Sequence, residues 1–125
     1  MAEDRKKVLV VEDNAVMLKS LTRALVQEGL TVLTAVDGSW GLDTALREKP
    51  VLIVLDVMMP NMDGISMLKK LREDAWGLTV PVIILTNLNY VEDMPELKGL
   101  APDFLLKPDV ELKDIVQRVK ERLAA

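Results

Sequence analysis

The feature that most constrains this chain is a regular alternation of short apolar runs with longer segments whose apolar residues recur at helical spacing. The runs are rich in Val, Ile and Leu, which is typical of buried strands. Strands are expected at residues 8–11, 31–35, 51–55, 80–85 and 103–106, and helices at 15–28, 40–47 and 65–72. A last helix is expected after Asp109, with an apolar stripe of Leu112, Ile115, Val116, Val119 and Leu123. Pro95 predicts only a short or irregular helix within residues 88–102. Strands that alternate with helices in this way predict an α/β fold, a parallel sheet with helices on both faces.

Small and polar residues mark the expected ends of these elements. Asn14 directly precedes the first helix and is expected to be its N-cap. Gly29 is expected to end that helix. Asp37 and Gly38 predict a turn after the second strand, and Asp109 is expected to cap the C-terminal helix.

Length and composition exclude several classes of protein. The 125 residues are expected to form a single domain, 1–125, although a domain cut from a longer chain would look the same. Cys and His are both absent, which excludes disulfides, thiolate or imidazole ligands and a histidine phosphoryl carrier within this chain. A net charge of −4 does not indicate the dense basic face of a nucleic-acid-binding protein. The longest apolar run, Val51–Leu55, is too short to span a membrane, and no signal core follows the charged start, so we expect a cytoplasmic protein.

Chemically active residues follow the expected strands. Glu12 and Asp13 come after the first strand, Asp56 ends the third, Thr86 the fourth and Lys107 the fifth. Doubly wound sheets bind ligands at the carboxyl ends of their strands, and in the common order 2-1-3-4-5 the first and third strands are neighbours. The three carboxylates are therefore expected to converge.

Converging carboxylates predict a bound cation. Two unit charges 4 Å apart repel by about 4 kcal/mol at an effective dielectric of 20, and a divalent ion removes that repulsion. Because only oxygen ligands are present, Mg²⁺ is the expected ion. Asp56 can then attack phosphorus and form an acyl phosphate. Thr86 and Lys107 are expected to stabilise the charged phosphoryl oxygens.

Several stretches of the sequence resemble the CheY-like receiver family of response regulators. They are Val8–Asn14, Leu55–Gly64, Thr86 and Asp103–Pro108, and the resemblance covers essentially the whole chain, in order and with the family's spacing. It implies a flavodoxin-like (βα)5 fold, a doubly wound five-stranded parallel sheet of order 2-1-3-4-5 with helices on both faces.

The resemblance implies the phosphoryl-handling residues. It makes Asp56 the phosphoacceptor and has Lys107 pair with the phosphoryl group, with a cis peptide bond between Lys107 and Pro108. It also matches Thr86 and Phe104 to the family's switch pair.

The resemblance implies the metal ligands as well. Asp13 and Asp56 are expected to bind Mg²⁺ directly, Glu12 mainly through water, and Met58 through its backbone carbonyl.

The implied function is that of a phosphoryl-accepting response regulator in a two-component phosphorelay. The donor is expected to be a sensor histidine kinase or a phosphotransfer protein, and the output protein is not identified by the sequence. No nucleic acid or membrane partner is expected, and no enzymatic activity beyond self-phosphorylation and autodephosphorylation. A monomer is expected, or a weak dimer through the face that the family forms from its fourth helix, fifth strand and fifth helix.

Three residues depart from the family's pattern. Asn87 replaces the usual small residue after the threonine, Pro95 lies where the fourth helix normally forms, and Asp109 replaces an apolar residue after Lys-Pro. These departures bear on the phosphoryl site, the output face and the choice of partner.

Alternative interpretations are open at this point. Taken singly, each site residue has an ordinary role as a cap, a loop residue or a core residue. An aspartate-nucleophile phosphatase would carry a second Asp where this chain has Met58, and a dinucleotide-binding enzyme would carry a Gly-rich turn in place of residues 12–14. A receiver-like adaptor that binds a partner without phosphorylation is the serious alternative.

Overall fold

The computed structural model describes residues 6–56, 64–86, 103–106 and 111–124, with residues 86 and 103–106 described by their backbone alone. The strands are β1 (Lys7–Val11), β2 (Thr31–Ala35), β3 (Leu52–Asp56), β4 (Val82–Thr86) and β5 (Asp103–Leu106). The helices are α1 (Ala15–Gln27), α2 (Gly38–Glu48), α3 (Gly64–Glu73) and α6 (Leu112–Ala124). Most predicted bounds are confirmed to within two residues. The irregular helix predicted within residues 88–102 lies outside the described residues.

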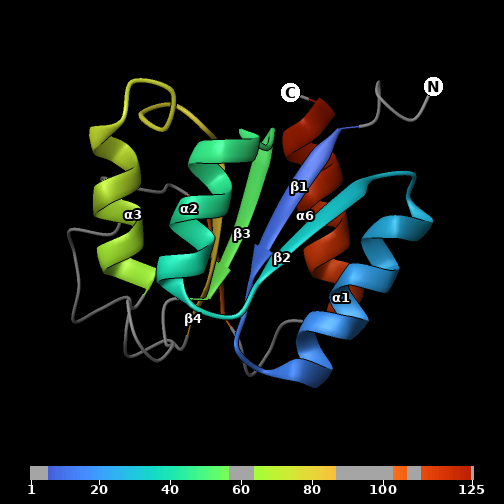
Figure 1. Cartoon of the computed structure of the whole chain (residues 1–125). Helices are drawn as coiled ribbons and strands as arrows, with labels where there is room; N and C mark the ends of the chain where they lie inside the picture. Colours follow the sequence, from blue (N-terminus) through green and yellow to red (C-terminus); the bar gives the residue numbers. More distant parts are fainter. Residues whose placement is uncertain (1–5, 57–63, 87–102, 107–110, 125) are drawn as a thin grey trace.

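The strands form one parallel sheet in the order β2-β1-β3-β4-β5, which confirms the predicted topology (Figure 1). Val11 of β1 pairs with Leu55 of β3, so the next residues on these neighbouring strands, Glu12 and Asp56, stand at the same level. This register brings the acidic residues together at one edge of the sheet.

Helices cover both faces of the sheet, and each face has its own apolar core. α2 and α3 cover one face, whereas α1 and α6 cover the other (Figure 1). Successive strand residues point to opposite faces. Leu9 and Ile53 therefore pack toward α2 and α3, and Val8 and Leu52 toward α1 and α6. Every residue of β3 is buried, as predicted for a central strand covered on both sides.

The helix ends confirm two predictions and correct a third. The Asn14 side chain caps α1, and Gly29 follows this helix with a φ of 87°, a conformation that favours glycine. The predicted turn at Asp37 and Gly38 is wrong. Asp37 instead caps α2 by accepting a hydrogen bond from Trp40 N at 2.8 Å, and Gly38 is the first residue of that helix. Asp-Gly is a strong turn signal, but an aspartate with extended backbone is equally suited to begin a helix.

At the start of α6, Asp114 accepts a hydrogen bond from Glu111 N at 3.0 Å, and the predicted cap, Asp109, lies outside the described residues. None of the described helices has both the length and the apolar character that a membrane span requires.

Candidate functional site

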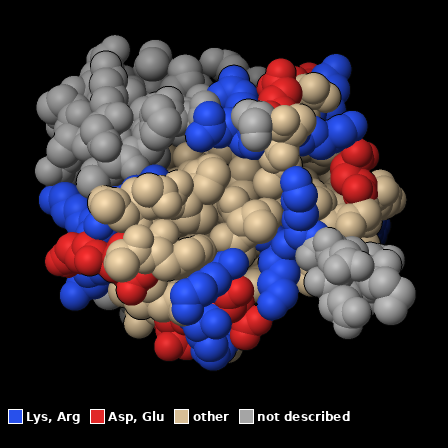
Figure 2. All heavy atoms as spheres, turned by 90° about the horizontal axis from the view of Figure 1, so that it is seen from above, with Lys and Arg blue, Asp and Glu red and all other residues tan. Residues whose placement is uncertain are grey.

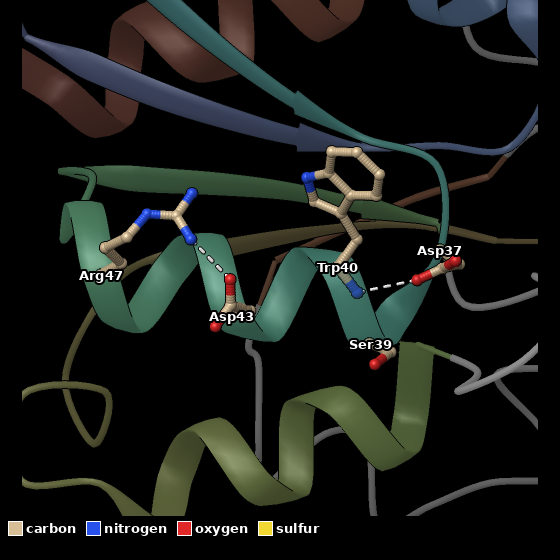
Figure 3. Close-up of a pocket in the computed structure, with 5 residues that line it drawn as sticks. All are labelled: Asp37, Ser39, Trp40, Asp43 and Arg47. Atoms are coloured by element: carbon tan, nitrogen blue, oxygen red, sulfur yellow. Dashed lines mark hydrogen bonds and ion pairs between the residues drawn. The ribbon is translucent and has the colours of Figure 1, made fainter.

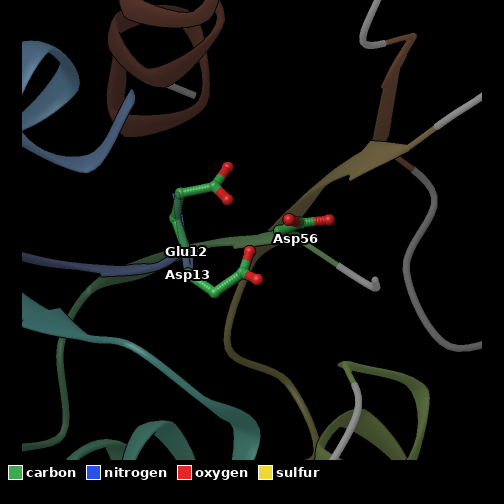
Figure 4. Close-up of side chains that lie close together, drawn as sticks. All are labelled: Glu12, Asp13 and Asp56. Carbon is green, nitrogen blue, oxygen red and sulfur yellow. The ribbon is translucent and has the colours of Figure 1, made fainter. Parts of the chain in front are cut away.

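A cluster of carboxylates lies at the carboxyl ends of β1 and β3 (Figure 4). Glu12 and Asp13 directly follow β1, and Asp56 is the last residue of β3. One oxygen from each of these three residues lies within 4.8 Å of the other two. The predicted convergence of the three carboxylates is confirmed.

The cluster is closed on one side and open on the other. Glu12 and Asp56 are 0% and 2% exposed, whereas Asp13 is exposed to solvent. Two unit charges 4.8 Å apart repel by roughly 3.5 kcal/mol at an effective dielectric of 20. The arrangement therefore favours a positive charge at the point where Asp13 opens the cluster to solvent.

Glu12 is held by hydrogen bonds at its backbone and at its side chain. Its N–H donates to Ala35 O at 3.0 Å, which fixes its backbone against the end of β2. Its Oε2 accepts from Asn14 N at 3.1 Å. The direction of this carboxylate is thus set by its neighbours in the chain.

The residues present fit a hard divalent cation. All three clustered groups offer carboxylate oxygen, the ligand type that Mg²⁺ prefers. Mg²⁺ usually keeps several waters, and the exposed side of Asp13 leaves room for them. Glu12, Asp13 and Asp56 are therefore the described residues that could hold such an ion.

The sheet also places the end of β4 beside the cluster. Asp56 pairs with Leu85, and Thr86 is the next residue and the last of β4. Phe104 lies in β5 opposite Ile84. The other predicted site residues, Met58 and Lys107, and the Lys107–Pro108 peptide bond lie outside the described residues, so their roles stay predictions.

Of the surface hollows on the described part of the molecule, two bear on the location of the site. One, of about 610 Å³, is lined by the capping residue Asp37 and one face of α2, where Trp40 is 59% exposed and Asp43 pairs with Arg47 (Figure 3). It contains none of the clustered carboxylates. The other, a groove of about 420 Å³ between α1 and the end of β2, has Asp13 in its wall beside Leu18 and Lys19. This groove borders the site.

Glu48 and Arg72, which lie outside the cluster, have pKa values that are shifted by their surroundings. The Lys7 ammonium, which donates to Glu48 Oε1 at 3.3 Å, lowers the pKa of Glu48. Burial lowers the pKa of Arg72, whose guanidinium donates to Gly77 O and Val80 O.

Lys and Arg side chains are interspersed with Asp and Glu on the face shown in Figure 2.

Asn14 has a second contact that the sequence interpretation missed. Its role as a helix cap was predicted, but its backbone bond to Glu12 was not. The signal in the sequence is the position of Asn14, two residues after Glu12 and directly before the helix. A residue there can contact the acid and the helix at the same time.

Comparison with known sequences finds a family match. The model of the response regulator receiver domain matches residues 8–120. The transcriptional regulatory protein PrrA of Mycobacterium tuberculosis is 43% identical over 118 residues, which is 94% of this chain and 49% of PrrA. The alkaline phosphatase synthesis transcriptional regulatory protein PhoP of Bacillus subtilis is 40% identical over 118 residues, 92% of this chain and 47% of PhoP. The chain spans about half the length of the curated relatives it matches.

Solved structures of similar fold agree with this match. The chemotaxis response regulator CheY4 of Vibrio cholerae has a TM-score of 0.85 and 28% identity, covering 94% of this chain and 98% of that one. A CheY-like response regulator receiver domain protein from Methanospirillum hungatei has a TM-score of 0.85 and 28% identity, covering 97% and 95%. The similarity extends over nearly the whole chain in both cases.

Proposed function

This chain belongs to the response regulator receiver domain family of two-component signalling, and we propose that it accepts a phosphoryl group on Asp56. The observation that carries the proposal is the buried Asp56 carboxylate at the end of a central strand, beside Glu12 and Asp13. Phosphorylation would then change a surface that binds an output protein.

The proposed reaction is a transfer from a phosphohistidine of the donor protein. A carboxylate oxygen of Asp56 attacks phosphorus, the new O–P bond forms as the P–N bond breaks, and the imidazole leaving group takes up a proton. Because every residue of β3 is buried, the backbone that carries Asp56 is held in one position. A fixed nucleophile needs little further ordering before it reacts.

The negative charge of the cluster opposes the approach of a phosphoryl group. Mg²⁺, when bound, would supply the positive charge that offsets both the carboxylates and the phosphoryl oxygens. Asp13 and Asp56 are proposed to bind it directly, Glu12 mainly through water, and Met58 through its carbonyl. Thr86 and Lys107 are proposed to donate to the phosphoryl oxygens from the ends of β4 and β5.

The partners belong to the same proposal. The donor is proposed to be a sensor histidine kinase or a phosphotransfer protein, and the output to pass through protein contact, without nucleic acid or membrane. PrrA and PhoP are transcriptional regulators by name, but this chain matches only about half of each. A cytoplasmic location, a monomer or weak dimer, and no enzymatic role beyond phosphorylation and dephosphorylation of its own Asp56 complete the proposal.

Labelling with acetyl phosphate, with and without Mg²⁺, tests the function. Intact-mass spectrometry is expected to show one added phosphoryl group that depends on Mg²⁺ and is lost in alkali, as expected of an acyl phosphate. Asp56→Asn should take up none. Asp43→Asn, which changes an exposed acid on α2 outside the cluster, is the matched control and should be labelled like wild type.

Two results would contradict the proposal. An adduct that persists in Asp56→Asn would mean that another residue is the nucleophile. Wild-type protein that stays unlabelled by acetyl phosphate and by a phosphorylated histidine donor would favour the adaptor that binds its partner without phosphorylation.

A further inference from the structure

We propose that Asn14 is a positioning residue that couples the carboxylate cluster to the first turn of α1. The inference rests on the proposed binding of Mg²⁺ by that cluster. It concerns the hydrogen bonds that Asn14 makes toward the cluster on one side and toward the helix on the other.

Asn14 contacts both the cluster and the helix. Its backbone N–H donates to Glu12 Oε2 at 3.1 Å. Its side-chain Oδ1 accepts from Met17 N at 2.9 Å, and its backbone carbonyl accepts from Leu18 N at 2.9 Å. The residue whose N–H orients the Glu12 carboxylate is therefore the same residue whose side chain and carbonyl accept hydrogen bonds from the helix.

The side chain of Asn14 controls the backbone bond through the conformation of the cap. Asn14 has the extended backbone typical of an N-cap, with φ −76° and ψ 113°. Removing the carboxamide takes away the bond to Met17 that favours this conformation. The N–H of residue 14 would then be held less firmly toward Glu12. Asp13 lies between these two residues in the chain, so its backbone would also be held less firmly.

The first two residues of α1 have little else to hold them, although Met17 and Leu18 of the same turn pack partly buried against the core. Ala15 is exposed and Val16 is 76% exposed, and no acidic residue lies in this turn to complement the positive end of the helix. Elements with few buried contacts open readily on their own. The order of these first two residues therefore depends strongly on Asn14.

The coupling must act in both directions. If the Asn14 cap raises the affinity for Mg²⁺ by some factor, bound Mg²⁺ stabilises the cap by the same factor. The amide of Met17, which donates to the cap, reports this second direction because its hydrogen exchange requires the cap to open. A purely structural role of Asn14 would not make this exchange respond to the metal.

The test is a Mg²⁺ titration of the full chain followed by amide NMR shifts, together with hydrogen exchange at Met17. Asn14→Ala is expected to bind Mg²⁺ about tenfold more weakly, the lower end of the effects seen for residues that support metal ligands. Asn14→Ser keeps a good capping side chain and should bind nearly as wild type does. Mg²⁺ should slow exchange at Met17 by about tenfold in wild type and by much less in Asn14→Ala.

Asp37 provides the matched control because it caps α2 in the same way, at 2.8 Å from Trp40 N. Asp37→Asn removes its charge, and Asp37→Ala removes its charge and its cap. The difference between these two variants therefore isolates the loss of a cap outside the cluster. Loss of the Asp37 cap should lower the stability of the fold, as Asn14→Ala does, and should leave the affinity for Mg²⁺ unchanged.

The outcomes separate this inference from the proposed function. Wild-type protein with no response to millimolar Mg²⁺ would overturn the proposed metal site and the coupling with it. If Asn14→Ala binds Mg²⁺ as tightly as wild type does, the coupling is overturned but the metal site stands. The coupling is also overturned if removal of the Asp37 cap weakens Mg²⁺ binding as much as Asn14→Ala does. If Asn14→Ala does not fold, Asn14→Gly replaces it, since glycine keeps most of the capping stability while freeing the backbone, and weaker Mg²⁺ binding is again expected.

Discussion

At the scale of single residues, the cluster joins two buried acids, Glu12 and Asp56, to one exposed acid, Asp13. Asp13→Asn removes one charge from this set and one proposed ligand. The metal-free variant is expected to be more stable than wild type because repulsion within the cluster falls. At a Mg²⁺ concentration one hundred times the dissociation constant, wild type should gain about 2.7 kcal/mol, and the variant should lose most of that gain.

Thermal melts with and without Mg²⁺ measure both effects. Asp43→Asn serves as the control, since it removes an exposed acid outside the cluster and should keep the full gain. Identical wild-type melting temperatures with and without millimolar Mg²⁺ would contradict the prediction.

The same residues show what a sequence can predict at this scale. The meeting of Glu12 and Asp56 was predictable because both residues lie at strand ends and the common strand order makes β1 and β3 neighbours. The bond from Asn14 N to Glu12 was not, because it depends on the direction of one side chain within a short loop. The roles of Met58 and Lys107 lie outside the described residues and stay predictions.

At the scale of elements, α2 packs against the sheet at an unusually close contact. A Cβ atom on Gly41 would lie 2.9 Å from Val11 Cγ2 and 3.1 Å from Met67 Sδ. Alanine is favoured over glycine inside a helix by about 1 kcal/mol. Overpacking a core costs about 1–3 kcal/mol, so we expect Gly41→Ala to destabilise the fold by up to about 2 kcal/mol.

Urea unfolding of Gly41→Ala measures the net effect. Ser39→Ala, at an exposed position on the same helix, should change stability little and controls for helix propensity. A higher unfolding midpoint for Gly41→Ala would mean that Val11 and Met67 move aside without strain.

The helix boundaries show where local patterns have two meanings. The first helix was predicted correctly because Asn14 and Gly29 each favour one role, a cap and a stop. Asp37 and Gly38 favour a turn and a helix start about equally. The extended backbone of Asp37, which leads directly from β2 into α2, decides between them.

At the scale of the whole molecule, the strand pattern predicted a sheet covered by helices on both faces, but it did not predict which strands lie beside each other. The apolar run that became β3 indicated a strand buried on both faces, which the structure confirms. The order β2-β1-β3-β4-β5 was taken from a common arrangement, because burial alone does not say which strand lies beside which. That order is what makes β4 the link between the phosphoacceptor strand and the outer strand β5.

This link predicts how a phosphoryl group would act at a distance. Asp56 pairs with Leu85 of β4, and Thr86 of β4 pairs with Leu106 of β5. Phosphorylation would add about 1.5 to 2 negative charges and three acceptor oxygens at Asp56. We expect the Thr86 hydroxyl to donate to one of these oxygens and Phe104 of β5 to rotate in response, which would change the surface of β5 and α6.

The size of this effect follows from one hydrogen bond. A bond to a charged group contributes about 1.5–3 kcal/mol, whereas moving a population from 1:99 to 99:1 requires about 5.5 kcal/mol. The expected shift is therefore graded unless a partner adds selectivity. Thr86→Ala loses one donor to the phosphoryl oxygens but keeps Asp56, so it should still be phosphorylated. At equal extents of phosphorylation, the amide shifts of residues 103–106 and 111–116 should fall well below those of the wild type. If these residues shift as fully in the phosphorylated variant, the coupling does not pass through Thr86.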